Sequence, residues 1–224
     1  MYKDDRITIV IPCLNEEAGV RKVLESLPDF VDEAIVVDND STDRTAEVAS
    51  EYGAVVIAEL SRGYGRAYKK GFAHATGDII ITLDGDHSYP VDALSYLLEA
   101  FRHSKVDFLS ASRLPLLDRD AMGWKNLVGN RMLSLVMSAL YLRWINDSQS
   151  GMWVFRRRAL EQMNLTSDGM AFSEEIKIEA IRNRNIGFRE IFINYSQRRG
   201  ETKLQMWRDG FQNLWFLFKK RLVP

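Results

Sequence analysis

Two carboxylates, Asp84 and Asp86, follow a run of apolar residues in the stretch IIITLDGDHSYP, residues 79–90. If the backbone there is still extended, residues two apart point to the same side, and both carboxylates can face one ion. Oxygen ligands of this kind suit a hard divalent cation, which proteins commonly share with the phosphates of a substrate. The alternative is a simple turn, because Asp-Gly-Asp is also good turn chemistry.

Two further acids, Asp38 and Asp40, follow another strand-like run. Runs of this kind, rich in Ile and Val, alternate along the chain with helix-like patterns: ITIVIP, AIVVD, AVVIA, DIIITLD and DFLSA. The alternation predicts an α/β fold with β-α-β units, a mostly parallel sheet and helices on both faces. Ligands of such sheets bind beyond the carboxyl ends of the strands. We therefore expect the four acids to gather at one sheet edge, where their mutual repulsion favours a bound cation.

Composition narrows the class of protein. The chain has 224 residues, is 46% hydrophobic and has a formal net charge of -1, which predicts one substantial core and no general attraction to nucleic acid. The N-terminal segment, MYKDDRITIV, lacks the pattern of a signal peptide, and Cys13 in its apolar run is expected to be a buried thiol. The longest apolar tract, residues 132–142, is too short to span a bilayer. We expect a cytoplasmic protein.

Seven segments, in this order, identify a family resemblance: IPCLNEE, VVDNDSTD, RGYGRA, LDGD, ASR, DSQSGMWVFRR and YSQRRGETKL. From about Ile7 to Leu204 the chain resembles family 2 glycosyltransferases. More narrowly, it resembles the dolichyl-phosphate mannosyl and glucosyl synthases and their polyprenyl-phosphate relatives. The resemblance implies a GT-A fold, a nucleotide-sugar donor, Mg²⁺ or Mn²⁺, and inversion at the anomeric carbon. We expect a GT-A catalytic domain over residues 1–202 and an amphipathic membrane-interface helix over residues 203–224.

The resemblance also implies a donor site. Its nucleotide-binding residues would be Pro12, Leu14, Asn15, Glu16, Asp38, Asp40, Arg66, Asp84 and Lys203. In the family, the carboxylate matching Asp38 bonds the nucleobase, and Asn39-Asp40 stands where most relatives have Asp-Gly. RGYGRAYKKG is no dinucleotide fingerprint, because its glycine spacing differs and it follows the third strand. We interpret it as a flexible basic segment suited to a diphosphate.

At the metal site the chain departs from the family. Synthases of this type carry D-A-D-L-Q-H-P, whereas this sequence reads DGDHSYP, so Ser88 takes the place of a glutamine. The resemblance implies Asp84, Asp86 and Ser88 as metal ligands. His87 is expected to be a bystander, because a hard cation prefers oxygen to imidazole.

The acceptor side is expected to depend on arginines. A lipid phosphate is already ionised at neutral pH and needs no protein base, and guanidinium groups match phosphate geometry. Arg113, Arg131 and Ser134 match family positions that contact the acceptor phosphate. Arg198 matches the segment that closes over the donor phosphates. The alternative is that these are ordinary surface arginines.

Three acids are relevant if the acceptor is instead a hydroxyl. Asp147 stands where many relatives have an acid near the sugar, and Asp147, Glu174 or Glu175 would then be the candidate base. The alternative for the FSEEIKIEAI helix is that its acids are simply solvated.

Two segments are relevant to a lipid. Residues 127–145 form a helix pattern that is apolar nearly all round. The tail places six large apolar residues at helical spacing, with basic residues after them: Leu204, Trp207, Phe211, Leu214, Trp215 and Phe218, then Lys219, Lys220 and Arg221. This composition is typical of a helix at an anionic membrane surface. The alternative is packing on the catalytic domain or on a second subunit.

The function expected from these features is transfer of mannose, glucose or an N-acetylhexosamine from a GDP- or UDP-sugar to dolichyl or polyprenyl phosphate, by a peripheral enzyme on the cytoplasmic face of a membrane. One alternative is transfer to a sugar or lipid hydroxyl. Another is a nucleotide-sugar-binding protein without turnover. The sequence leaves the sugar, the base and a possible homo-oligomer open.

Overall fold

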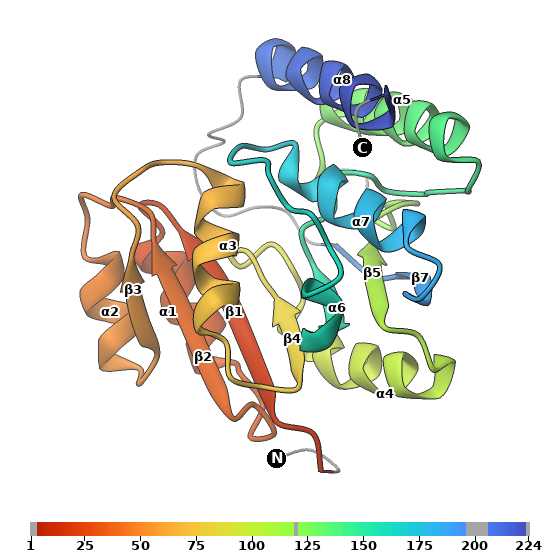
Figure 1. The fold of residues 1–224 in the computed structure, drawn as a ribbon. Helices are drawn as coiled ribbons and strands as arrows, with labels where there is room; N and C mark the ends of the chain where they lie inside the picture. Colours follow the sequence, from red (N-terminus) through yellow and green to blue (C-terminus); the bar gives the residue numbers. More distant parts are fainter. Residues whose placement is uncertain (1–3, 119–120, 196–205, 223–224) are drawn as a thin grey trace.

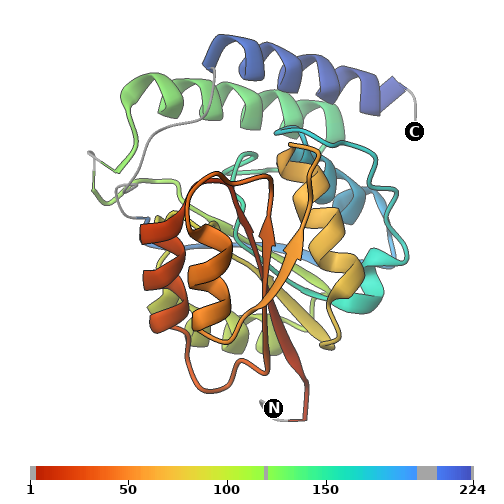
Figure 2. The same ribbon diagram turned by 90° about the vertical axis from the view of Figure 1, so that its left-hand side faces the viewer.

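A single seven-stranded sheet, with helices on both faces, organises the computed structural model, which describes residues 4–118, 121–195 and 206–222 (Figures 1 and 2). The strands are β1 (Ile7–Cys13), β2 (Glu33–Asp38), β3 (Val55–Ala58), β4 (Ile79–Thr82), β5 (Phe108–Ser112), β6 (Trp153–Arg156) and β7 (Phe188–Phe192). The helices are α1 (Glu17–Glu25), α2 (Thr45–Glu51), α3 (Tyr64–His74), the 3₁₀ turn η1 (Val91–Ala93), α4 (Leu94–Ser104), α5 (Trp124–Tyr141), α6 (Arg157–Leu160), α7 (Phe172–Arg182) and α8 (Met206–Leu222).

The strand order is β3-β2-β1-β4-β6-β5-β7. Only β6 runs antiparallel to its neighbours, β4 and β5; every other strand pair of the described sheet is parallel. The predicted mostly parallel α/β sheet is confirmed. Because β6 runs in the opposite direction, the start of β6 lies at the same sheet edge as the carboxyl ends of β1, β2, β4 and β5. This edge is called the carboxyl edge below.

Side-chain alternation along the strands builds a core on each face of the sheet. Ile9 and Ile81 pack with α1, α2 and α4 on one face, whereas Val10 and Ile80 pack with α3, α5, α7 and α8 on the other. The four residues of β4 are completely buried, as expected for a strand covered on both faces.

The C-terminal helix α8 lies beside α5 at one end of the molecule (Figures 1 and 2). Its Leu217 side chain is completely buried, and the Tyr141 hydroxyl of α5 donates a hydrogen bond to the Leu217 carbonyl oxygen over 3.4 Å. One face of α8 therefore packs on the α/β domain. The expected domain boundary at 202/203 and Leu204 lie outside the described residues.

Candidate active site

The end of β1 separates two acidic segments of the carboxyl edge. Asp38, the last residue of β2, is paired with Cys13 of β1. On the other side of β1, Gly85 packs closely against Cys13. A Cβ atom added to Gly85 would lie only 2.4 Å from the Cys13 Sγ. Neighbouring strands are about 4.8 Å apart, so Asp38 and the Asp84–Asp86 turn lie about two strand spacings apart. As predicted, Cys13 is buried.

The Asp84 carboxylate is held by two tyrosines of α3. The Tyr64 hydroxyl lies 3.2 Å and the Tyr68 hydroxyl 3.3 Å from Asp84 Oδ1. Burial raises the pKa of both phenols well above the ordinary value, with the Asp84 charge acting in the same direction. Both tyrosines are therefore protonated and act as donors to the carboxylate.

The Asp86 carboxylate is held by the turn in which it lies. Its Oδ1 accepts hydrogen bonds from the backbone N–H of Ser88 over 3.0 Å and from the Ser88 hydroxyl over 2.6 Å. Between them, His87 has a left-handed backbone with φ of 59°. Both Asp86 and Ser88 are buried, so this turn presents an ordered carboxylate and a hydroxyl oxygen rather than a solvated loop.

The donor set at this turn is two carboxylates and one hydroxyl, all hard oxygen ligands of the kind that Mg²⁺ and Mn²⁺ accept. Within the described residues, no three side chains of His, Cys, Asp or Glu come together to hold a metal by themselves. The residues present fit a cation that completes its coordination with oxygens of a substrate.

The β2 end of the carboxyl edge includes an unsatisfied oxygen. Among the described atoms, Asp38 Oδ1 is buried and has no hydrogen-bond partner. A buried carboxylate oxygen normally has a donor, so this atom suits an N–H group of a ligand.

The loop after β1 supports this corner. Asn15 has a φ of 52°, and its Oδ1 accepts the Thr42 N–H over 2.7 Å; the Glu16 N–H donates to Thr45 Oγ1. Pro12 and Leu14 are half-buried beside it. The loops after β1 and β2 are thereby tied together.

Asn39 and Asp40 replace the Asp-Gly pair that most relatives have, and the turn still forms. Asp40 has a φ of 67°, a left-handed conformation that Asp tolerates better than most residues. Asn39 is buried and holds the next loop, donating to the carbonyl oxygens of Glu59 and Ser61. Asp40 forms an exposed ion pair with Arg62.

From Tyr64 onward the RGYGRAYKKG segment is part of helix α3, which corrects the expectation of a flexible segment. A Cβ atom on Gly65 would lie 2.4 Å from the Ser167 carbonyl oxygen, so the glycine permits close packing. Arg66 and Lys69 both form ion pairs with Asp168. Two other residues of this segment, Tyr64 and Tyr68, contact the Asp84 carboxylate, and sequence reasoning missed both.

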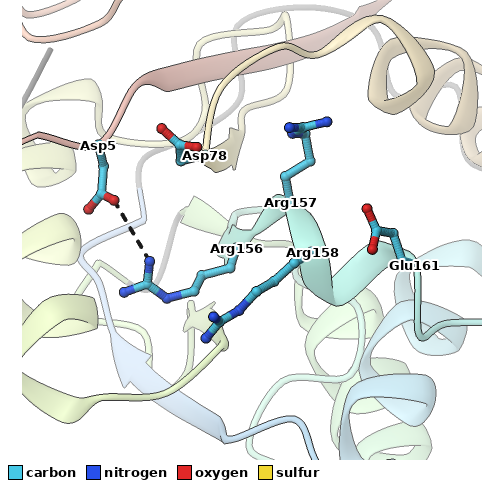
Figure 3. A pocket seen from close by; sticks show the side chains of 6 residues that line it. All are labelled: Asp5, Asp78, Arg156, Arg157, Arg158 and Glu161. Carbon is cyan, nitrogen blue, oxygen red and sulfur yellow. Dashed lines mark ion pairs between the residues drawn. The ribbon is translucent and has the colours of Figure 1, made fainter.

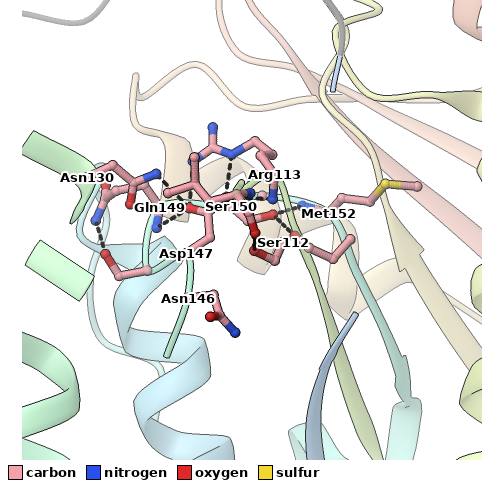
Figure 4. Close-up of polar contacts among 12 residues, drawn as sticks. Ser112, Arg113, Asn130, Asn146, Asp147, Gln149, Ser150 and Met152 are labelled. Carbon is pink, nitrogen blue, oxygen red and sulfur yellow. Dashed lines mark hydrogen bonds and ion pairs between the residues drawn. The ribbon is translucent and has the colours of Figure 1, made fainter. Parts of the chain in front are cut away.

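On the other side of β4, the completely buried Asp147 forms an ion pair with the partly buried Arg113 (Figure 4). Arg113 Nε donates to Asp147 Oδ2 over 2.7 Å and Nη2 donates to Oδ1 over 2.9 Å, while Asn130 Nδ2 donates to Oδ1 over 2.8 Å. Burial alone would raise the pKa of Asp147, but the Arg113 charge and these hydrogen bonds hold it below the ordinary value. The guanidinium also lies over the Tyr195 ring, 5.3 Å from its centroid.

A buried lysine fixes the loop that carries Asp147. Lys177 Nζ of α7 donates to the carbonyl oxygens of Asp147, Ser148 and Ser150 over 2.8, 2.9 and 3.0 Å. Burial lowers the pKa of Lys177 to about 8, against the opposing effect of Asp147. This lysine had no signal in the sequence beyond its place on a helix.

The two acids at the start of α7 are completely buried, so the alternative that they are solvated is wrong. Glu174 Oε1 accepts from Gln149 Nε2 over 2.7 Å, and burial raises the pKa of Glu174 well above the ordinary value. Glu175 accepts from the backbone N–H groups of Thr166 and Ser167 and from Lys220 of α8.

The remaining residues that were predicted to bind the acceptor phosphate or the donor phosphates lie in different surroundings. Ser134 is buried behind Asp147, where its hydroxyl donates to Asn130 Oδ1 and accepts the Ser148 N–H over 2.9 Å. Arg131 lies on the exposed side of the same helix. Arg198 and Lys203 lie outside the described residues.

A surface pocket at the opposite sheet edge is unrelated to this site (Figure 3). It is lined by three acids and three arginines: Asp5, Asp78, Glu161, Arg156, Arg157 and Arg158. Asp78 directly precedes β4, so this pocket and Asp84 lie at opposite ends of the strand.

The sheet topology, with an acidic turn at its carboxyl edge, is that of a GT-A fold. The chain aligns with glucosyl-3-phosphoglycerate synthase from Mycobacterium tuberculosis, solved with Mn²⁺, UDP-glucose and phosphoglyceric acid, at a TM-score of 0.81. That alignment has 22% identity and covers 99% of this chain and 81% of that one.

Residues 8–163 match glycosyl transferase family 2, and the chain belongs to this family. It is 30% identical to the dolichyl-phosphate hexose transferase of Haloferax volcanii, over 93% of this chain and 91% of that protein. It is 34% identical to the low-salt glycan biosynthesis hexosyltransferase Agl6 of the same organism, over 94% of this chain. The chain spans only 52% of the length of Agl6.

Proposed function

We propose that this glycosyltransferase moves a hexose, with inversion, from a GDP- or UDP-sugar to dolichyl or polyprenyl phosphate. The observation that carries the proposal is the pair of ordered carboxylates, Asp84 and Asp86, at the same sheet edge as the unsatisfied Asp38 oxygen. Two strand spacings between them suit a nucleotide whose base lies at Asp38 and whose diphosphate lies at the acidic turn. The dolichyl-phosphate hexose transferase named above supports the choice of acceptor.

Asp84 and Asp86, with Ser88, would hold Mg²⁺ or Mn²⁺, which when bound stabilises the negative charge that develops on the departing diphosphate. The protein contributes the orientation of these oxygens, through Tyr64 and Tyr68 on one side and the Ser88 turn on the other. Arg198 and Lys203 remain predicted contacts of the donor phosphates.

A phosphate acceptor agrees with the state of the buried acids. A general base needs a pKa near the working pH and access to the proton it removes. Asp147 is held ionised by Arg113, with a lowered pKa, which makes it a poor base. Glu174 has no exposed surface and is bonded to Gln149. An acceptor phosphate needs neither acid, and Arg113 at the carboxyl edge is the proposed contact for its charge.

Arg131 has a different proposed role, because it lies on the outer side of α5 rather than beside Arg113. There it would meet the head group of the acceptor lipid rather than the reacting oxygen. Ser134 supports the Asp147 network through Asn130 and Ser148.

The surface of α5 and α8 supports binding to a membrane. Each helix exposes an apolar stripe with a spacing of three or four residues: Trp124, Val128, Met132 and Leu135 on α5, and Phe211, Trp215, Phe218 and Leu222 on α8. The exposed cations near the stripes are Lys125, Arg131, Lys219 and Arg221. Aromatic side chains with basic neighbours suit an anionic lipid surface. In the part of the chain that the structure describes, no helix is long and apolar enough to cross a bilayer.

The test is incubation of the purified protein with UDP- and GDP-hexoses, Mn²⁺ or Mg²⁺, and polyprenyl phosphate, with products identified by mass. A polyprenyl-phosphate hexose is the expected product, with its formation lost in Asp86→Ala. Activity unchanged in Asp86→Ala would contradict the metal role. A glycosylated hydroxyl, lost in Asp147→Asn or Glu174→Gln, would instead identify a base-catalysed transferase, and binding without product would identify a non-catalytic protein.

A further inference from the structure

We infer that Tyr64 and Tyr68 are positioning residues for the cation site, because their two hydroxyls fix the orientation of the Asp84 carboxylate. The inference rests on the proposed role of Asp84 as a ligand. The sequence analysis gave a role only to the basic residues of RGYGRAYKKG, and this inference gives one to its two tyrosines.

Both hydroxyls meet the same carboxylate oxygen. Tyr64 and Tyr68 are one helical turn apart on α3, and their hydroxyls lie 3.2 and 3.3 Å from Asp84 Oδ1. Both distances exceed the usual 2.7–2.8 Å of an O–H···O bond, so neither bond is strong by itself. Two donors that converge on one oxygen still define the plane of the carboxylate, and neutral donors leave its negative charge available.

The phenol rings are held so that the hydroxyls cannot move far. Tyr68 is completely buried, and its ring stacks on Phe172 with centroids 5.9 Å apart and lies 5.2 Å from the Trp153 ring. The Tyr64 ring meets Tyr68 edge-on at 4.9 Å. The single proton of the Tyr68 hydroxyl is shared between two acceptors, Asp84 Oδ1 and the Gly151 carbonyl oxygen, each 3.3 Å away.

The chemistry of the surrounding cluster points to a role for the hydroxyls themselves. The rings around Tyr68 belong to Tyr64, Phe72, Phe172 and Trp153, and a phenylalanine would fill the same space. A buried hydroxyl costs free energy unless it is hydrogen-bonded. Here the bonding partners are a carboxylate and a backbone carbonyl at the carboxyl edge. Groups that orient metal-binding side chains typically change metal affinity by 10–100-fold when removed.

The test compares Tyr64→Phe, Tyr68→Phe and the double variant with the wild-type protein. Calorimetric titration with Mn²⁺, in the presence of UDP or GDP, gives the metal dissociation constant. We expect it to rise about 10-fold in each single variant and further in the double variant, while nucleotide binding without metal is unchanged. Tyr141→Phe is the matched control, because it loses a hydroxyl bond to the Leu217 carbonyl oxygen away from Asp84.

The outcomes separate the inference from the proposed function. An unchanged Mn²⁺ dissociation constant in the double variant overturns the inference and leaves the proposed function standing, whatever happens to the melting temperature. A lower melting temperature with unchanged metal affinity would make the hydroxyls purely structural. A wild-type protein that binds no Mn²⁺ with either nucleotide overturns the proposed function, and the inference with it.

Discussion

At the scale of single residues, Gly151 is the point where the two sides of the site meet. Its N–H donates to the Tyr89 hydroxyl over 2.7 Å, and its carbonyl oxygen accepts from Thr82 Oγ1 over 2.7 Å. A Cβ atom here would lie 2.2 Å from the Tyr64 hydroxyl and 3.3 Å from Asp84 Oδ1. The loop that carries Asp147 can approach Asp84 only because this residue has no side chain.

Gly151→Ala should therefore displace the Tyr64 hydroxyl. We expect a loss of about 1–3 kcal/mol in the free energy of unfolding, the usual cost of overpacking, and a transfer rate at least about 10-fold lower. Adding Tyr64→Phe should recover part of the stability but not the rate. Urea denaturation and activity assays check this. Gly129→Ala is the control, since nothing lies within 4 Å of its Cβ position; equal effects at both glycines would contradict the explanation.

Lys177 makes the stability of the protein depend on pH in a specific direction. With a folded-state pKa of about 8 and an ordinary value of 10.5, it is protonated in both states below pH 8. Between these two values the unfolded chain binds more protons than the folded chain, so the free energy of unfolding rises with pH.

Between pH 7.5 and 9.5, the free energy of unfolding of the wild-type protein should rise by about 2 kcal/mol relative to that of Lys177→Met. Denaturation of both proteins at several pH values measures the difference and cancels the contribution of other groups. A difference that stays constant, or falls, would show that burial does not lower the pKa of Lys177.

Sequence reasoning placed Asp38, Asp84 and Asp86 at one sheet edge, because residues that follow parallel strands meet there. It missed Tyr64 and Tyr68, whose four-residue spacing was a usable signal that the neighbouring glycines and arginines obscured. It also treated Arg113 and Asp147 separately. Their ion pair joins residues 34 positions apart, and local patterns carry no information about such a contact.

At the scale of elements, the junction of α7 and α8 depends on one buried cation. Lys220 Nζ lies 3.0 Å from Glu175 Oε1 and 3.0 Å from Glu179 Oε1. In the middle of α8, Asn213 Nδ2 donates over 2.9 Å to Oε1 of Gln149, a residue of the loop that follows Asp147. Helix α8 is thereby connected to the active-site loop.

Lys220→Met should destabilise the protein by about 3–5 kcal/mol, because it leaves buried carboxylates without their counter-charge. The neighbouring Lys219 is exposed, and Lys219→Met should change the free energy of unfolding by less than about 0.5 kcal/mol. Denaturant titration of the two variants makes the comparison. Equal free energies of unfolding in the two variants would mean that the buried ion pairs of Lys220 do not stabilise the packing of α8 on α7.

The strands and most helices were predictable because their periodicity is local. The inner face of α8 was not: Asn213, Leu217 and Lys220 form the buried stripe, at a spacing of four and three residues. Two of these three are polar, so hydrophobicity alone did not distinguish the buried face from the exposed one. Lys220, expected at a membrane surface, is instead a structural residue.

At the scale of the whole molecule, α5 and α8 lie side by side at one end of the protein (Figure 2), and each helix has an exposed apolar stripe. Trp215 is 65% and Phe211 71% exposed, unusual values for side chains of this size. Contiguous exposed apolar surface normally marks a binding surface. The proposed occupant is an anionic membrane that carries the lipid acceptor.

Phe211→Ser with Trp215→Ser should weaken binding to vesicles that contain phosphatidylglycerol by at least about 10-fold, because the apolar area inserted into the interface is lost. Activity on a short, soluble polyprenyl-phosphate analogue should be unchanged. Vesicle sedimentation and the two assays test this. Tyr96→Ser, at an exposed aromatic of α4, is the control. Unchanged vesicle binding in the double variant would exclude the stripe as the membrane surface.

The central claim is that the Asp84–Asp86 turn binds a diphosphate through a cation. A binding measurement tests it most directly. Calorimetric titration of UDP and GDP, with and without Mn²⁺, should show tight binding of one nucleotide that depends on Mn²⁺. In Asp86→Asn, which keeps the size of the side chain but removes its charge, we expect the Mn²⁺ dependence to disappear while weak metal-free binding persists. Equal Mn²⁺-dependent binding by the wild-type protein and Asp86→Asn would contradict the account.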